Sequence, residues 1–433
     1  MAEKLKTQLQ ISCDLMSQIK KNIRNIKAFQ AELEKNKGTN ISLLLSALLF
    51  GALSLEASDI HLEVEANQTK VRLRLDGALF DAGVLAKETY LQALNRLKLF
   101  SSVKLNITQK PQDGRFAILA GKTEIEIRTS TLPSEFGETI VMRLLNPKNL
   151  ISLNELGLRD DMARILKEEI KKPNGMIIST GPTGSGKTTS LYGILKTINA
   201  SDIKIITIEN PIEYRLAGVS QSQVDETKGY DFATGLATIV RQDPDVILVG
   251  EIRDQQTANI AIQAAMTGHL VLTTLHTNDA AGTISRLQAL GEKAENIAPA
   301  LNLVIAQRLL RKVCPQCAKE KNLSLEEATF INKNLENLFK KGICEKVTEK
   351  TKVLTAQGCE SCNQIGYKGR IGVYEFLLVD DEMENFINKG PSIVNLKAEA
   401  KRKGMTTMLQ DGLIKTLKRI TTLKEVSKEV GKE

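Results

Sequence analysis

The sequence predicts an α/β protein in which helices cover both faces of a parallel sheet. A glycine-rich segment, Gly181–Thr188, follows the apolar run Met176–Thr180 and precedes a helical pattern over Thr189–Ile198. From about residue 157 onward, short apolar runs alternate with amphipathic helices, and chains with this alternation form parallel sheets. Ligands bind such sheets at the carboxyl edge of the strands, which is where the glycine-rich segment is expected.

The glycine-rich segment has the spacing G-x-x-x-x-G-K-[ST] in the strand–turn–helix context that this phosphate-binding motif requires. Its three glycines can adopt backbone angles closed to other residues, so that successive N–H groups point at a phosphate. Lys187 is expected to supply charge to the β- and γ-phosphates, and the Thr188 hydroxyl to ligate Mg²⁺. The alternative, a glycine turn beside a surface lysine, does not account for the flanking strand and helix. The predicted nucleotide-binding residues are Gly181, Pro182, Thr183, Gly184, Ser185, Gly186, Lys187, Thr188 and Thr189.

Two acidic residues follow predicted strands of the same sheet. The strands are expected at Ile203–Ile208, Val246–Val249 and Leu270–Thr274, and the helices at Asp231–Arg241, Gln255–Met266 and Asp279–Leu290. Glu251, after the second strand, is expected beside the phosphate site, where it can orient the Mg²⁺ hydration shell or activate the attacking water. Glu209, after the first strand, should reach the same edge and polarise water or the metal. An exposed glutamate after a strand is the alternative for Glu251, and the complete phosphate-binding motif argues against it.

Two histidines, His269 and His276, flank the third strand. A lone histidine is usually structural, and metal ligation is the other common role of this residue. Two histidines at strand ends beside a nucleotide site can instead sense the γ-phosphate. The spacing leaves these alternatives open.

The first 148 residues are expected to form a helical arm, residues 1–40, and a small α+β domain, residues 41–148. Apolar residues of the arm recur at three- and four-residue steps, at Ile19, Ile23, Ile26, Phe29 and Leu33. This face either packs on the protein's own core or docks onto a partner, and we slightly favour docking. In the α+β domain, the strand Lys70–Leu75 alternates so that Arg72 and Arg74 lie on its exposed face. A helix is expected at Lys87–Leu99 and a hairpin around Gly121.

Charge and composition narrow the functional classes. The 433 residues carry a net charge of +8 from 59 basic and 51 acidic residues, an excess compatible with nucleic acid or an anionic membrane surface. The absence of Trp and the 4% aromatic content leave few stacking platforms for single-stranded bases.

Met1–Gln10 is polar, unlike a secretory signal. The longest apolar run, Ile41–Leu55, is shorter than the ~20 residues of a spanning helix, so we expect a soluble, cytoplasmic protein.

Two C-x-x-C pairs, Cys314/Cys317 and Cys359/Cys362, predict a metal site. Two such pairs complete the tetrahedral shell of four thiolates that structural Zn²⁺ prefers. The alternatives are four reduced thiols or a redox pair, and we favour zinc. The other two cysteines, Cys13 and Cys344, are left outside this site.

Together these segments resemble one family, the ATPases of type II secretion and type IV pilus assembly. The phosphate-binding motif and the segments around Glu209, Glu251 and the two histidines match its Walker A, aspartate, Walker B and histidine boxes in order. Ser58–Glu63, Pro111–Arg115 and Ser130–Pro133 resemble its N-terminal domain. The resemblance covers about residues 41–425. It implies a PAS-like fold for the α+β domain, a RecA-like P-loop ATPase domain at 149–310, a tetracysteine zinc subdomain at 311–376 and a C-terminal helical region at 377–433.

The same resemblance implies roles for individual side chains. Glu251 would be the catalytic or water-orienting carboxylate and Glu209 an active-site acid, with His269 and His276 facing the γ-phosphate. The family also places arginines of the N-terminal domain at the nucleotide, where they stabilise charge on the phosphoryl oxygens. The candidates are Arg72, Arg74, Arg115 and Arg128, and we favour Arg115 and Arg128 over ordinary surface arginines.

The resemblance implies a hexameric motor with ATP, Mg²⁺ and Zn²⁺ as its ligands. It would extend a pilin or pseudopilin fibre by acting on an inner-membrane platform protein from the cytoplasmic face. The tetracysteine segment favours an assembly or secretion motor, because retraction motors of the family lack it. One alternative is a DNA-translocating or DNA-uptake-linked P-loop ATPase, although we expect no direct contact with nucleic acid. Another is a nucleotide-gated scaffold without hydrolysis.

Overall fold

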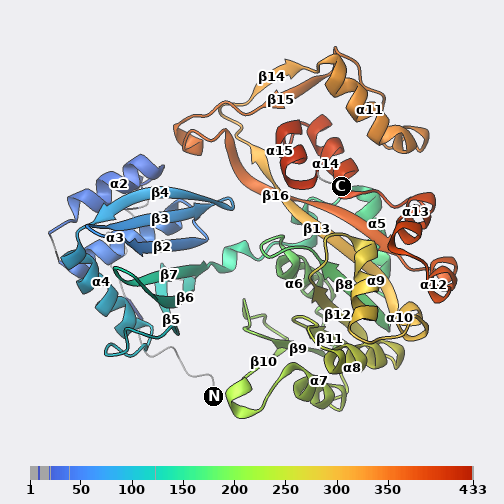
Figure 1. The fold of residues 1–433 in the computed structure, drawn as a ribbon, viewed down its shortest axis with the longest axis horizontal. Coiled ribbons are helices and arrows are strands. Elements are labelled where there is room, and N and C mark those ends of the chain that lie inside the picture. Colours follow the sequence, from blue (N-terminus) through green and yellow to red (C-terminus); the bar gives the residue numbers. More distant parts are fainter. Residues whose placement is uncertain (1–7, 10–18, 20, 39, 122, 432–433) are drawn as a thin grey trace. The chain divides into compact units, whose positions relative to one another are not determined.

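The chain folds into two compact units (Figure 1). The computed structural model describes residues 8–9, 19, 21–38, 40–121 and 123–431. The first unit extends to Asn149 and includes the short segments Cys314–Cys317 and Gln357–Lys368. The second unit contains Leu150–Val313, Ala318–Ala356 and Gly369–Glu433. The sequence-based division into an arm, an α+β domain, an ATPase domain, a zinc subdomain and a C-terminal helical region stays a prediction.

The first unit is built on a seven-stranded sheet in the order β1-β5-β6-β7-β2-β3-β4. The two-residue β1 pairs in parallel with β5, and all the other pairs are antiparallel. The strands are β1 (Gln8–Leu9), β2 (Asp59–Val64), β3 (Thr69–Leu75), β4 (Ala78–Leu85), β5 (Gln112–Ala120), β6 (Thr123–Ser134) and β7 (Gly137–Leu145). The helices are α2 (Ile26–Lys35), α3 (Ile41–Ser54) and α4 (Lys87–Phe100). Strand β3 alternates buried and half-buried residues, so its arginines lie on the face away from the core, as the period of two predicts.

The N-terminal arm packs on the core of its own unit. Phe29 and Leu33 of α2 are 0% and 2% exposed, and Ile19 and Ile23 are each 2% exposed in the same cluster. Gly51 of α3 provides the space, because a Cβ there would lie 2.7 Å from the Phe29 ring. Our preference for a docking arm is therefore wrong for this apolar face, which is already covered. Residues 1–7 and 10–18, which include Cys13, lie outside the described residues.

The second unit contains the predicted α/β sheet, in the order β10-β9-β11-β12-β8-β13-β16. Its strands are β8 (Gly175–Thr180), β9 (Ile205–Glu209), β10 (Ser220–Gln223), β11 (Val246–Val249), β12 (Leu270–Leu275), β13 (Leu301–Val313) and β16 (Tyr367–Leu378). The neighbouring strands from β10 to β13 pair in parallel. The flanking helices are α5 (Asp160–Glu169), α6 (Lys187–Ile198), α7 (Phe232–Val240), α8 (Gln255–Met266), α9 (Ala280–Ala289) and α10 (Ala294–Ala300).

Helices cover both faces of this sheet, which confirms the predicted fold class. Alternate residues of β8 belong to different cores: Met176 and Ile178 pack with α7–α10, whereas Ile177 packs with α5 and α6. Strands β14 (Lys319–Asn322) and β15 (Lys352–Thr355) pair in an antiparallel manner, and α11 (Leu325–Lys340) lies between them in the sequence. The chain ends with α12 (Asp381–Asn388), α13 (Ile393–Arg402), α14 (Met408–Leu417) and α15 (Leu423–Val430).

Within the described part of the chain, every helix is too short or too polar to span a bilayer. The most apolar stretch, expected as a buried helix, forms α3. Nine of its residues are buried against the first unit's core.

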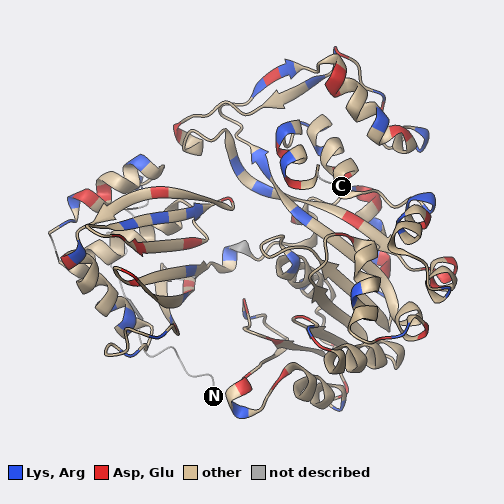
Figure 2. Cartoon of the chain, in the orientation of Figure 1, with Lys and Arg blue, Asp and Glu red and all other residues tan. Residues whose placement is uncertain are grey.

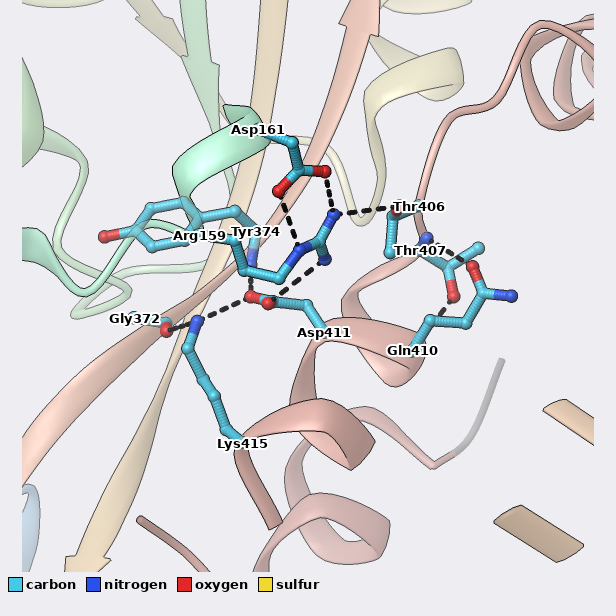
Figure 3. Close-up of polar contacts among 9 residues, drawn as sticks. All are labelled: Arg159, Asp161, Gly372, Tyr374, Thr406, Thr407, Gln410, Asp411 and Lys415. Atoms are coloured by element: carbon cyan, nitrogen blue, oxygen red, sulfur yellow. Dashed lines mark hydrogen bonds and ion pairs between the residues drawn. The ribbon is translucent and has the colours of Figure 1, made fainter. Parts of the chain in front are cut away.

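A buried ionic network joins the C-terminal helices to the sheet of the second unit (Figure 3). Asp411 of α14 is 0% exposed. Its carboxylate accepts hydrogen bonds from Arg159 at 3.3 Å, from Lys415 at 2.6 Å and from the Tyr374 backbone N–H at 3.0 Å. Arg159 also forms a bidentate pair with Asp161 at the start of α5. Burial lowers the pKa of Lys415, and the Asp411 charge opposes that shift.

Asp411→Ala should destabilise the protein strongly. Removing the carboxylate leaves Lys415 as a buried cation without its ion-pair partner, and breaking a buried pair in this way costs about 3–5 kcal/mol. The urea midpoint of the full chain, followed by circular dichroism, should fall clearly. In Glu382→Ala, which removes a carboxylate that is 59% exposed, the midpoint should stay close to that of the wild type. Equal midpoints for both variants would contradict the role of the network.

Candidate active site

The phosphate-binding turn connects the central strand β8 to α6. Gly181, Gly184 and Gly186 have φ values of 145°, 80° and 93°, in the region that other residues avoid. At Gly181 a Cβ would also lie 2.5 Å from the backbone oxygen of Gln307. The turn therefore needs glycine for its conformation and for its close contact with β13. Helix α6 begins at Lys187, so its N-terminal N–H groups and dipole favour an anion at this position.

Lys187 lies inside the turn, with its side chain largely buried. Its Nζ donates to the backbone oxygens of Gly181 at 2.8 Å and Pro182 at 3.1 Å. Burial lowers the pKa of Lys187, and the negative charge of Glu251 opposes this shift. The two side chains thus interact electrostatically, although 64 positions separate them in the sequence.

Glu251 lies directly beyond the end of β11, as predicted. Its carboxylate pairs with Arg253 at 2.5 Å and lies 3.7 Å from His276 Nε2. Burial lowers the pKa of His276, and the positive charge of Lys187 acts in the same direction. The structure therefore brings together Lys187, Glu251 and His276 at one edge of the sheet.

Threonine hydroxyls tie the strand ends of this edge to one another. The Thr180 hydroxyl accepts from the Thr277 N–H at 2.9 Å and lies 2.7 Å from the Thr277 hydroxyl. The Thr274 hydroxyl donates to the backbone oxygen of Gly250 at 2.7 Å. Strands β8, β11 and β12 thus end in one hydrogen-bonded group, which holds the loops of Lys187, Glu251 and His276 in register.

Glu209 ends β9, and its carboxylate points into the protein. It accepts hydrogen bonds from Tyr192 at 2.5 Å, Thr207 at 2.6 Å and Gln221 at 3.4 Å. Burial raises the pKa of Glu209 despite these donors, and only 3% of the residue is exposed. The tyrosine belongs to α6, so Glu209 links the helix of the phosphate-binding turn to β9.

His269 lies at the opposite edge of the sheet from His276. It precedes β12, its backbone oxygen accepts from the Gly175 N–H at the start of β8, and its Nδ1 lies 3.0 Å from the Ala264 oxygen. The strand between the two histidines has six residues, or about 20 Å at ~3.3 Å per residue. The expectation that both histidines face the γ-phosphate is therefore wrong for His269 within its own chain.

Gln307 of β13 supports the phosphate-binding turn from behind, and no motif in the sequence predicts this role. The residue is 1% exposed, its Nε2 donates to the Ser185 oxygen at 2.8 Å, and its Oε1 accepts from Ser179 at 3.4 Å. It lies 122 residues from Ser185. No local sequence signal marks it, because a glutamine in a predicted strand is not associated with any motif.

The favoured arginines lie in the first unit. Arg115 of β5 and Arg128 of β6 are direct cross-strand partners, so both side chains lie on the same face of that sheet. Arg128 Nε is 3.3 Å from Glu126.

The four predicted zinc ligands form one cluster. All their sulfur atoms lie within 4.8 Å of one another, with separations of 3.9 Å between Cys314 and Cys359 and of 3.7 Å for Cys362 with both Cys317 and Cys359. A Zn–S length of about 2.3 Å gives a tetrahedral sulfur–sulfur edge of about 3.8 Å, which these distances match.

Backbone donors make the cluster suitable for thiolates. The N–H groups of Cys359 and Gly366 each lie 3.2 Å from Cys362 Sγ, and that of Gly358 lies 3.3 Å from Cys317 Sγ. Burial opposes ionisation of Cys362, but hydrogen bonds from the two N–H groups and from the Cys359 and Cys317 thiols together lower the pKa of that thiol. The residues fit a structural Zn²⁺ ion, while Cys344 is outside the cluster.

The fold and the phosphate-binding turn define a P-loop nucleotide-binding protein. More specifically, the chain belongs to the family described as "Type II/IV secretion system protein", whose model matches residues 34–428.

Named relatives support this assignment. The type IV pilus assembly ATPase PilB of Thermus thermophilus is 43% identical over 86% of this chain and 41% of its own length. PilB of Myxococcus xanthus is 40% identical over 88% of this chain and 66% of its own length. Type II secretion system protein E of Dickeya dadantii is 42% identical over 90% of this chain and 76% of its own length. The chain thus spans less than two thirds of either PilB.

Two solved structures are similar along most of the chain. The pilus retraction motor PilT with bound ADP has a TM-score of 0.59 and 26% identity, covering 88% of this chain and 95% of PilT. The ATPase DotB of Legionella pneumophila has a TM-score of 0.64 and 22% identity, covering 89% of this chain and 94% of DotB. At this level of identity, the similarity supports the fold and nothing further.

Gln307→Leu should weaken nucleotide binding. It leaves the buried Ser185 oxygen without its donor, which costs about 1–3 kcal/mol, or about five- to hundredfold in Kd if the turn loses its binding geometry. Titration calorimetry with Mg-ADP measures this change. The matched control is Gln263→Leu, at an exposed position of α8, which should bind as the wild type does. An unchanged Kd in Gln307→Leu would contradict the supporting role.

Proposed function

We propose that this chain hydrolyses ATP and uses the energy to drive type IV pilus assembly or type II secretion. The observation that carries the proposal is the convergence of Lys187, Glu251 and His276 beside a complete phosphate-binding turn. Relatives of the same family are named as a type IV pilus assembly ATPase and a type II secretion protein. The partner would be a membrane platform protein, engaged from the cytoplasmic side.

Each residue of the site has a distinct role in this proposal. The N–H groups of the turn and Lys187 bind the phosphates, and the Thr188 hydroxyl ligates Mg²⁺, which neutralises charge on the β- and γ-phosphates. Glu251 orients or deprotonates the attacking water. His276, 3.7 Å from Glu251, lies where it can report the state of the γ-phosphate to β12.

Glu209 and two arginines complete the proposed site. Glu209, at the end of β9, would polarise water or the metal, and it also fixes α6 against β9 through Tyr192. Arg115 and Arg128 stabilise the charge that the phosphoryl oxygens carry during transfer. The active assembly in this proposal is a ring, usually of six copies.

Zinc has a structural role in this proposal. Cys314, Cys317, Cys359 and Cys362 would hold one Zn²⁺ ion in a closed shell, which contributes folding free energy and leaves no open coordination position for catalysis.

Substitutions at Lys187 and Glu251 should separate binding from hydrolysis. Lys187→Ala should abolish phosphate release. Glu251→Gln should retain ATP but reduce kcat by about 10²- to 10⁴-fold, the contribution typical of a general base. Phosphate release and retention of radiolabelled ATP provide the two measurements. Glu295→Gln, an exposed carboxylate of α10, should retain wild-type turnover. Undiminished hydrolysis in Lys187→Ala would refute the site.

The purified chain should contain about one zinc ion per copy, measured by mass spectrometry of the metals. The double variant Cys314→Ser/Cys317→Ser should lose the ion, because two thiolates of the shell are removed. Limited proteolysis should then cut near the cluster, whose segments the metal no longer holds. Cys344→Ser should keep both the metal and the resistance to protease. Equal zinc content in the double variant would contradict the site.

A further inference from the structure

Strand β16 has a carboxylate at a position where an apolar residue would be expected. Val373 and Leu377 pack in the core that contains α9. Tyr374 and Phe376 pack in the core on the opposite face of the sheet. Alternate residues of a strand point to the same side, so Glu375 lies on the α9 face with Val373 and Leu377. Glu375 is the acidic residue that Figure 2 shows on β16. It is only 3% exposed, and a buried charge is costly unless it is paired or hydrogen-bonded.

Glu375 caps the N-terminus of α9. Its Oε1 accepts a hydrogen bond from the Ala280 N–H at 3.1 Å, across 95 positions of the sequence. The first N–H groups of a helix have no partner within the helix, and the helix dipole favours a negative charge there. Asp279, which directly precedes α9, accepts from the Gly282 N–H at 2.8 Å. Two carboxylates thus fix the first turn of α9, one from the preceding loop and one from the sheet.

The same turn of α9 is bonded to the loop that carries His276. The Thr277 hydroxyl donates to the backbone oxygen of Asp279 at 2.9 Å and lies 3.1 Å from the hydroxyl of Thr283, which is 0% exposed. The four residues His276–Asp279 are all of the chain between β12 and α9. A shift at the start of α9 would therefore displace His276.

The cap formed by Asp279 has a counterpart elsewhere in the second unit. Asp279 Oδ2 pairs with Lys397 of α13 at 2.7 Å, while its Oδ1 caps α9. Asp380 likewise caps α12, by accepting from the Met383 N–H at 3.0 Å, and pairs with Lys403 at 2.8 Å. Of these two similar caps, that of Asp279 belongs to the loop of the candidate active site. Asp380 therefore provides a matched control.

We propose that Glu375 is a positioning residue for His276. By fixing the start of α9, it holds the loop that places His276 3.7 Å from Glu251. This inference rests on the proposed function, because it assigns a role beside the site that hydrolyses ATP. It adds a residue of β16 to the strands that support this site, and it accounts for a carboxylate at a core position.

Two substitutions test the hydrogen bond in steady-state hydrolysis of Mg-ATP by the full chain. Glu375→Leu removes the acceptor, whereas Glu375→Gln keeps an oxygen that can accept from Ala280. Glu375→Leu should lower kcat about tenfold, since a small displacement at an active site can cost up to about 10²-fold in rate. Its KM should change less than about threefold, because the phosphate-binding turn stays in place. Glu375→Gln should keep a kcat close to that of the wild type. Equal losses in both variants, or no loss in Glu375→Leu, would overturn the proposal.

Asp279→Ala provides a second test, which leaves the core unchanged. It removes the other carboxylate cap of α9, at a side chain that is 19% exposed, and should also lower kcat. The control Asp380→Ala removes a cap and a lysine pair of the same kind from α12 and should keep wild-type kcat. The same kcat in both aspartate variants would contradict a specific role for the start of α9. Thermal unfolding midpoints identify any variant that fails to fold.

A double variant tests whether Glu375 acts through His276. Glu375→Leu/His276→Ala should have the same kcat as His276→Ala alone, because the histidine that the cap positions is already absent. A general loss of stability would instead lower the activity of both backgrounds. If the two losses multiplied, the residues would act independently, and the positioning role would be refuted.

Chemical labelling of histidines separates this proposal from the proposed function. Diethylpyrocarbonate modifies accessible imidazoles, peptide mass spectrometry locates the sites, and the His276 side chain is 52% exposed. The analogue Mg-ATPγS should protect His276 in the wild type but not in Glu375→Leu, while His269 should be labelled equally in both. If the wild type hydrolysed no ATP yet showed this difference, the proposed function would fail and the positioning role would stand. If hydrolysis were normal and His276 were labelled alike in both proteins, the positioning role would be refuted and the function would stand.

Discussion

The active site depends on how the phosphate-binding turn is held at the end of β8. That strand lies between β12 and β13, so its carboxyl end is supported from both sides. The Thr180 hydroxyl links it to the Thr277 loop, and Gln307 links the turn to β13. A glycine-rich turn has little conformational preference of its own. Its geometry for binding phosphate is therefore supplied by neighbouring strands.

The parts that the sequence predicted well have local signals. The glycine spacing, the apolar runs and the alternation of β3 are all readable within a few residues, and the helices α7, α8 and α9 fall at the expected positions. Glu251 could be placed because it follows a strand whose carboxyl end meets the turn. The cysteine cluster could be predicted because each pair has ligand spacing on its own.

The parts that the sequence did not predict depend on register and distant pairing. A strand flanked by two histidines does not indicate which of them lies at the ligand edge, and the structure places only His276 there. Gln307 contacts a turn that lies 122 residues away in the sequence. For the arm around Phe29, the apolar period is the same for a helix that docks on a partner and one that packs on its own core.

The support of the turn by β13 also sets an order of events during synthesis on the ribosome. The complete glycine motif leaves the ribosome long before Leu301–Val313. A nascent chain that ends at α9 carries the motif without the glutamine and the strand behind it. The hydrogen bond that supports the turn from behind can therefore form only after β13 has been translated.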